Sequence, residues 1–184
     1  MNHKDNFDWL LGGLFLALAI ALPLAFHLVG MGSTFLPMFY PVVLAGFLLR
    51  LQVSVLVGIL APLLSAALTG MPPLYPPVAF IMVLELLVMT ALPWMFFQRL
   101  RLNIYLSLFL TVLAERLVLL LATWIVADWL KLPGMVLGPV TMVKGLPGLI
   151  IIFLVIPPAA LKIREKMRQS PFLQPESPAE SEIR

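Results

Sequence analysis

The chain has 184 residues, of which 61% are hydrophobic and 11% charged, and its mean hydropathy is +1.04. A soluble domain of this length does not combine these values, so the composition predicts an all-α integral membrane protein. The absence of cysteine excludes disulfides and thiolate chemistry, and two histidines argue against a histidine-rich metal site. The net charge of +3 comes from cations at the ends of apolar segments, so nucleic acid is not expected as a partner.

Six apolar segments are expected in the membrane, because a spanning helix needs about 20 apolar residues. They cover residues 9–29, 34–49, 52–70, 76–97, 103–130 and 136–161. We take 1–8 as the N-terminus and 162–184 as a basic tail that is disordered from about Ser170. Most cations lie in segments that an even number of helices places on one side: Lys4, Arg50, Arg99, Arg101, Lys162, Arg164, Lys166, Arg168 and Arg184. The positive-inside rule makes that side, and both termini, cytoplasmic.

The first apolar segment, 9–29, is preceded by one cation and two acids and is long enough to span, so we expect a retained helix rather than a signal peptide. Small residues recur in it at every fourth position: Gly13, Ala17, Ala21 and Ala25. Residues at this spacing line one stripe and let another helix approach closely. The spacing alone leaves two alternatives open, packing inside the bundle and docking of a partner.

The second segment and the outer loops supply the apolar surface that a binding pocket needs. Residues 35–41 read FLPMFYP, and the two prolines each remove a backbone donor, so the helix is expected to begin irregularly. The candidate pocket side chains here are Phe35, Met38, Tyr40 and Tyr75. His27, at the outer end of the first helix, bonds either a ligand or a loop carbonyl, and we favour the carbonyl because one histidine without a partner is weak support for a site.

Four ionisable residues lie at similar depth in the later helices. Glu85 is near the membrane midplane, Glu115 and Arg116 are slightly beyond it, and Lys144 falls in the first turns of the last helix. A charged side chain at the bilayer centre costs about 2.5–3.5 kcal/mol on insertion scales, so these residues must face protein or a water-filled cavity. One arrangement pairs Glu85 or Glu115 with Arg116 or Lys144 across helices and leaves donors for a ligand. The alternative is a wholly structural ion network.

No nucleophile, metal cluster or phosphate-binding loop accompanies these acids, so neither an enzyme nor a cofactor is expected. Uphill transport would take its energy from another subunit or from an ion gradient.

Three stretches resemble the substrate-binding S component of energy-coupling factor (ECF) transporters for vitamins and related micronutrients. They are FLPMFYPVVLAGFLL, VGILAPLLSAALTGMPPLYPP and FIMVLELLVM, and the similarity extends over residues 9–161. The resemblance implies a six-helix bundle in a prokaryotic cell membrane that captures a small molecule from outside, using helices four to six and the first and third outer loops. It also implies a transmembrane coupling subunit and two cytoplasmic ATPases as partners.

In that family an alanine motif on helix one contacts the coupling subunit, and Ala17, Ala21 and Ala25 match it. The loaded subunit is thought to topple in the membrane so that its pocket faces the cytoplasm. For the ligand, we expect Arg116 and Lys144 as anion donors and Glu85 and Glu115 as acceptors or orienting groups. A pantothenate-like acid would suit such a site.

The main alternative from another class is a membrane scaffold similar to rod-shape-determining subunits. In a scaffold the charged layer would be structural, and the small-residue stripe would recruit cell-wall machinery. A stand-alone secondary transporter is disfavoured by the small size and the absence of paired repeats.

Overall fold

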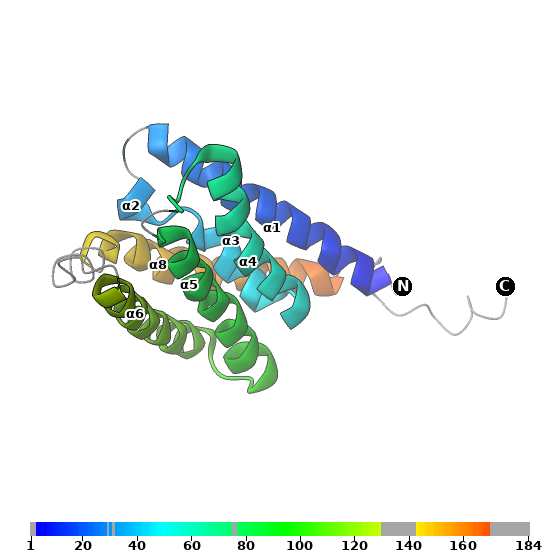
Figure 1. The fold of residues 1–184 in the computed structure, drawn as a ribbon. Coiled ribbons are helices and arrows are strands. Elements are labelled where there is room, and N and C mark those ends of the chain that lie inside the picture. Colours follow the sequence, from blue (N-terminus) through cyan, green and yellow to red (C-terminus); the bar gives the residue numbers. More distant parts are fainter. Residues whose placement is uncertain (1–2, 29, 31, 75–76, 130–142, 170–184) are drawn as a thin grey trace, which may run out of the picture.

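The structure is a computed structural model that describes residues 3–28, 30, 32–74, 77–129 and 143–169. These ranges contain helices and no strand, which confirms the all-α prediction (Figure 1). In chain order the elements are α1 (His3–Leu28), α2 (Gly32–Phe35), α3 (Phe39–Leu48), α4 (Leu51–Thr69), α5 (Val78–Pro93), the π-helical turn η1 (Trp94–Arg99), α6 (Ile104–Trp129) and α8 (Leu146–Gln169).

Five helical segments within the described ranges are long and apolar enough to cross a bilayer: Asp5–Leu28, Leu51–Thr69, Val78–Arg99, Ile104–Trp129 and Leu146–Gln169. The chain is therefore a multi-pass membrane protein. The first four lie within a few residues of the predicted spans. The last apolar span was expected to end at residue 161 and to be followed by a basic helix end, and α8 continues through these basic residues to Gln169. Its expected beginning, 136–142, and the tail from residue 170 lie outside the described ranges.

The apolar segment predicted over 34–49 is interrupted. α2 ends at Phe35, Leu36 has a positive φ of 50°, and α3 begins at Phe39. The left-handed region is unfavourable for a residue with a Cβ atom and is incompatible with a continuing α-helix. The Phe39 N–H donates to the Leu36 carbonyl at 2.9 Å and closes the turn. The irregular beginning predicted from the prolines is confirmed, and the 10 residues of α3 are too few to span a bilayer.

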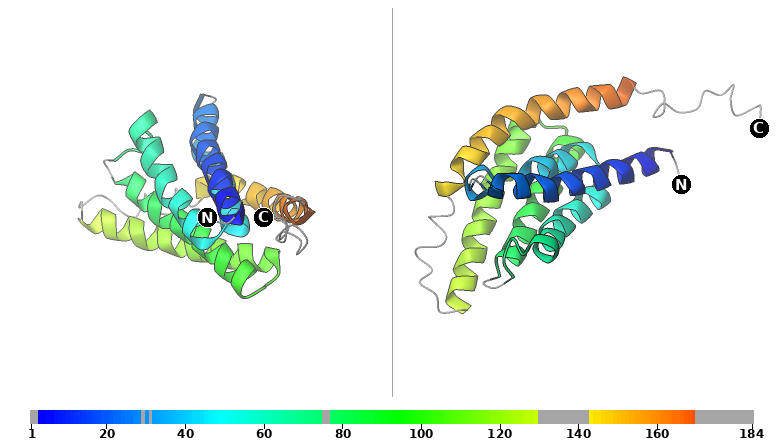
Figure 2. Two further views of the ribbon diagram at one scale, coloured as in Figure 1. Left: turned by 90° about the vertical axis from the view of Figure 1, so that its right-hand side faces the viewer. Right: turned by 90° about the horizontal axis from the view of Figure 1, so that it is seen from above.

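α3 occupies the centre of the bundle and packs against α1, α4, α5 and α8 (Figures 1 and 2). It is apolar on all sides, as a helix must be when protein surrounds it, and Phe39, Val42, Val43 and Phe47 are almost fully buried. Gly46 lets it approach α5 so closely that an added Cβ atom would lie 2.8 Å from the Thr90 carbonyl oxygen. Dispersion contacts at this distance hold helices together where lipid supplies no hydrophobic driving force.

One end of the bundle is held together by an ion cluster. Arg50, between α3 and α4, binds two acids on the first turns of α1: its Nη1 lies 2.7 Å from Asp5 Oδ1, and its Nε lies 2.9 Å from Asp8 Oδ2. The cation thereby fixes the beginning of α1 to the α3–α4 junction.

The same end contains two further contacts between distant segments. Gln98 Nε2 donates to the carbonyls of Gly46 and Leu49 at 3.1 and 3.0 Å, so it satisfies oxygens that the end of α3 leaves free. The Arg164 guanidinium lies 4.8 Å from the centre of the Phe97 ring, a cation–π distance. The beginning of α1 and the end of α8 therefore share one end of the bundle, which we call the terminal end (Figure 2).

Candidate functional site

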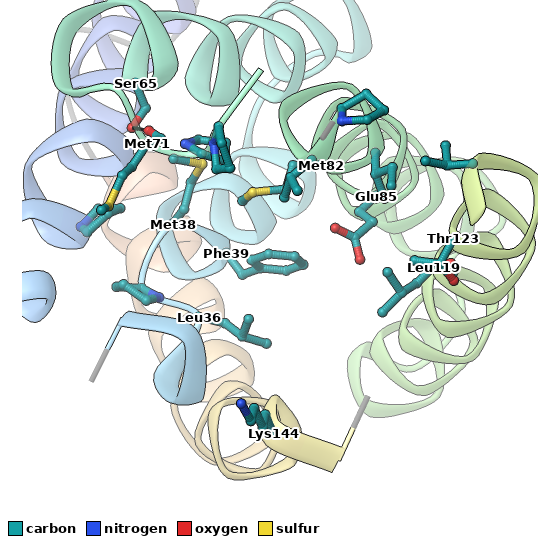
Figure 3. Close-up of a pocket in the computed structure, with 18 of the residues that line it drawn as sticks. Leu36, Met38, Phe39, Ser65, Met71, Met82, Glu85, Leu119, Thr123 and Lys144 are labelled. Carbon is teal, nitrogen blue, oxygen red and sulfur yellow. Dashed lines mark hydrogen bonds between the residues drawn. The ribbon is translucent and has the colours of Figure 1, made fainter. Parts of the chain in front are cut away.

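A cavity of about 450 Å³ lies at the opposite end of the bundle, which we call the cavity end. The end of α1, the turn before α3, the end of α4 and its following loop, the first half of α5, the second half of α6 and Lys144 all contribute to its wall (Figure 3). Its volume lies within the range of small-molecule sites.

The loop after α4 is held in place by its own hydrogen bonds. α4 ends at Thr69 and is followed by Gly70, which has a φ of 72° and whose N–H donates to the Ala66 carbonyl. Glycine adopts this left-handed conformation without steric cost, so the chain can turn sharply. Ser65 Oγ then donates to the Met71 carbonyl at 2.7 Å. This bond fixes the loop that contributes Met71, Pro72 and Pro73 to the cavity wall.

Most of the wall is apolar. Met38, Phe39 and Met82 project into its middle part, and Met71 lies at its edge beside Ser65 (Figure 3). Methionine side chains adapt to irregular shapes because they are unbranched and polarizable. Prolines from three segments complete the wall and restrict its backbone: Pro23, Pro37, Pro72, Pro73 and Pro77. A ligand would therefore bury an apolar body here.

Arg116 lines the cavity, and Glu115 lies behind it. Arg116 Nε donates to Glu115 Oε2 at 2.7 Å, and its Nη2 donates to Glu115 Oε1 at 2.8 Å. The Glu115 side chain is 0% exposed and that of Arg116 is 14% exposed. The ion pair is thus bidentate and formed by adjacent residues of one helix. The expected ion pair across helices is not present among the described residues, because the long arginine side chain folds back onto its neighbour.

Glu85 is 6% exposed, and its carboxyl group points from α5 into the cavity toward Leu119 and Thr123 of α6 (Figure 3). The charged groups that interact electrostatically with the Glu85 carboxyl are the Glu115 carboxyl and the Arg116 guanidinium. Neither Arg116 nor any other cation of the described residues forms an ion pair with Glu85. The α5–α6 wall thus carries two acids and one cation.

Lys144 and His27 also line the cavity, and both are exposed. Lys144 is helical and lies two positions before α8 begins at Leu146. The His27 side chain makes no hydrogen bond to the described residues, while its backbone carbonyl accepts one from the Gly30 N–H. Lys144 lies on a different side of the cavity from Glu85 (Figure 3).

Of the predicted site residues, Glu85, Arg116, Lys144, Met38 and His27 come together around the cavity. The other four predicted site residues do not line the cavity in the part of the chain that the structure describes. Phe35 packs against Phe26 with ring centres 5.9 Å apart, and Tyr40 is half-buried outside the cavity wall. Tyr75 lies outside the described residues. Glu115 supports the wall through Arg116.

Sequence reasoning missed the aliphatic and hydroxyl side chains that complete the wall. On α5 these are Val78, Ile81 and Met82, and on α6 they are Leu119, Thr123, Val126 and Ala127. On each helix they follow one another in steps of three or four residues that start from Glu85 or Arg116, so they share a helix face with that residue. Extending that spacing from the two charged residues would have found them.

The small-residue stripe on α1 faces away from the bundle. Gly13, Ala17, Ala21 and Ala25 are all exposed, and nothing lies within 4 Å of a Cβ atom added at Gly13. The opposite face of α1 carries buried Gly12, Phe15 and Ala19. Of the two alternatives, packing of the stripe against another described helix of this chain does not occur.

No protein-family model, curated protein or solved structure matches the chain.

Proposed function

We propose that this protein is the substrate-binding subunit of an ECF-type importer, which captures a vitamin or related small molecule from outside a prokaryotic cell. The observation that carries the proposal is the cavity of about 450 Å³ at the cavity end, into which Glu85, Arg116 and Lys144 bring charged groups from three parts of the chain. Charged residues in membrane segments commonly mark substrate pathways, and a mostly apolar cavity with few polar groups is typical of small-molecule sites.

The direction of capture follows from charge. The terminal end carries the basic residues around Arg50, Arg99 and Arg101 and those at the end of α8. The cations that line the cavity among the described residues are Lys144 and Arg116, and Arg116 is paired with Glu115 inside α6. By the positive-inside rule the terminal end is cytoplasmic and the cavity faces outside.

The partners we propose are a transmembrane coupling subunit, which docks on the exposed stripe of α1, and two cytoplasmic ATPases. The stripe supports this assignment because Ala17 and Ala21 leave room for a helix to approach where the chain itself places none.

The ligand half of the proposal is tested by purifying the protein gently in detergent, denaturing it, and identifying released small molecules by mass spectrometry. Met82→Trp should fill the cavity and release nothing, whereas Leu113→Trp, which adds the same bulk to an exposed position on α6, should retain the compound. If wild-type protein releases no compound and no vitamin raises its melting temperature, the charged wall is structural and the scaffold alternative takes precedence.

The partner half is tested separately by replacing both Ala17 and Ala21 with Leu. We expect ligand release from the purified variant to be unchanged and uptake by cells to be lost, since the added bulk blocks helix approach. Wild-type protein should copurify with ATPases, whereas a scaffold should copurify with morphogenesis proteins. Normal uptake by the variant would remove α1 from the interface.

A further inference from the structure

The charges of the α5–α6 wall do not balance among the described residues. Arg116 uses its bidentate edge on Glu115, which is fully buried behind it. Glu85, 6% exposed, has no cation within ion-pair distance among the described residues. With the three groups ionised, this wall carries one negative charge more than it carries positive charges.

A carboxylate removed from water costs free energy unless a cation, a hydrogen-bond donor or a proton compensates its charge. Glu85 points into a cavity large enough for a small molecule, and Met82, Phe39, Leu119 and Thr123 line the wall near it. The charged groups that interact with it are the Glu115 carboxyl and the Arg116 guanidinium. The cavity itself therefore offers the place from which compensation can come (Figure 3).

We propose that Glu85 binds a cationic nitrogen of the ligand, whose apolar body lies against the methionines of the cavity wall. This inference rests on the proposed function and departs from the anionic ligand expected from the sequence. The expectation treated Arg116 as a free anion donor, but Glu115 accepts two of its five N–H donors and neutralises its charge.

The position of Lys144 agrees with this assignment. Lys144 lies near the beginning of α8, and Figure 3 shows it on a different side of the cavity from Glu85. It does not neutralise Glu85. A ligand whose cation binds Glu85 would extend its other end across the cavity, toward the side of the wall that carries Lys144.

Three probes with one apolar body test the proposal: hexylammonium, hexanol and hexanoate. The melting temperature of the purified protein is measured as each probe is titrated. We expect hexylammonium to bind wild-type protein more tightly than hexanol, and Glu85→Gln to weaken hexylammonium binding by about tenfold or more while leaving hexanol unchanged, because a charge-assisted hydrogen bond is lost. Glu165→Gln, which removes an exposed carboxylate at the terminal end, is the matched control and should keep the preference for hexylammonium.

Several outcomes would overturn the proposal. Tighter binding of hexanoate than of hexanol, lost in Lys144→Gln, would mean that the cavity recognises an anion. Equal binding of hexylammonium and hexanol would mean that the charge of Glu85 is compensated by a proton shared between the Glu85 and Glu115 carboxyl groups. If Glu85→Gln fails to fold, the order of the affinities of the three probes for wild-type protein still decides between a cationic and an anionic ligand.

The proposed function fails by a different result, the absence of any released compound from wild-type protein. A released compound without a cationic nitrogen would leave the proposed function standing and overturn this inference alone.

Discussion

Glu115 and Arg116 pack two charges into the interior of a membrane helix by neutralising each other. Side chains of adjacent residues diverge by about 100° around the helix axis, yet the flexible arginine side chain reaches back to place both donors on one carboxylate. The pair needs no partner from another helix. Its stability therefore depends on both residues being present, since either charge alone would be buried without compensation.

Arg116→Ala should lower the free energy of unfolding by about 3 kcal/mol or more, because it leaves the fully buried Glu115 carboxylate without its cation. Thermal unfolding in detergent, followed by circular dichroism, measures the loss. The double variant Glu115→Leu with Arg116→Leu should recover most of it, since both charges are then absent. A single variant as stable as wild-type protein would show that the ion pair contributes little.

At the scale of elements, contacts between backbones set the positions of the central helices. Gly46 brings α3 to within van der Waals distance of α5, and Gly58 does the same for α4, where an added Cβ atom would lie 2.9 Å from the Leu86 carbonyl oxygen. Both contacts fall on the α5 residues that follow Glu85. The glycines thereby fix the rotation of α5 that points Glu85 into the cavity.

Gly46→Ala should destabilise the protein by about 1–3 kcal/mol, because the added methyl group meets backbone atoms of Thr90 and Met89 that cannot move away easily. Gly13→Ala is the matched control. It should leave stability unchanged or raise it by up to about 1 kcal/mol, since the position is helical and has open space around it. Both changes can be read from melting temperatures. Equal stability of the two variants would contradict the close α3–α5 approach.

For the whole molecule, the two ends differ in charge and in packing. The terminal end joins distant segments through Arg50, Gln98 and Arg164, whereas the cavity end holds the mostly apolar cavity. The described helices connect these ends in alternating directions, so a single orientation in the membrane determines which end faces outside. The distribution of basic residues predicts that the terminal end is cytoplasmic.

Single cysteines test this orientation cleanly because the chain has none of its own. A membrane-impermeant maleimide added to intact cells should label Leu74→Cys, which is exposed near the cavity, and should not label Asn103→Cys, which is exposed in the turn before α6. Asn103→Cys should react after the cells are opened. The reverse pattern would invert the topology and make the cavity cytoplasmic.

Much of the architecture was readable from the sequence because membrane helices are local features. Apolar runs of sufficient length predicted the long helices, the prolines around Met38 predicted the interruption before α3, and the depth of each charge predicted which ones share a layer. Depth along a helix needs only the rise per residue. The same reasoning brought Glu85, Arg116 and Lys144 to one region of the bundle.

Only the tertiary structure decided how each helix is rotated about its axis and which groups each charged side chain contacts. The sequence determined by itself that the chain crosses a membrane and buries charged residues there, because hydrophobic length and residue order suffice for that. The pairing of Arg116 with Glu115, the lack of an ion pair at Glu85 among the described residues and the outward direction of Ala17 depend on side-chain reach and on backbone contacts such as that of Gly46 with Thr90. These contacts join residues far apart in the chain, so no local pattern encodes them.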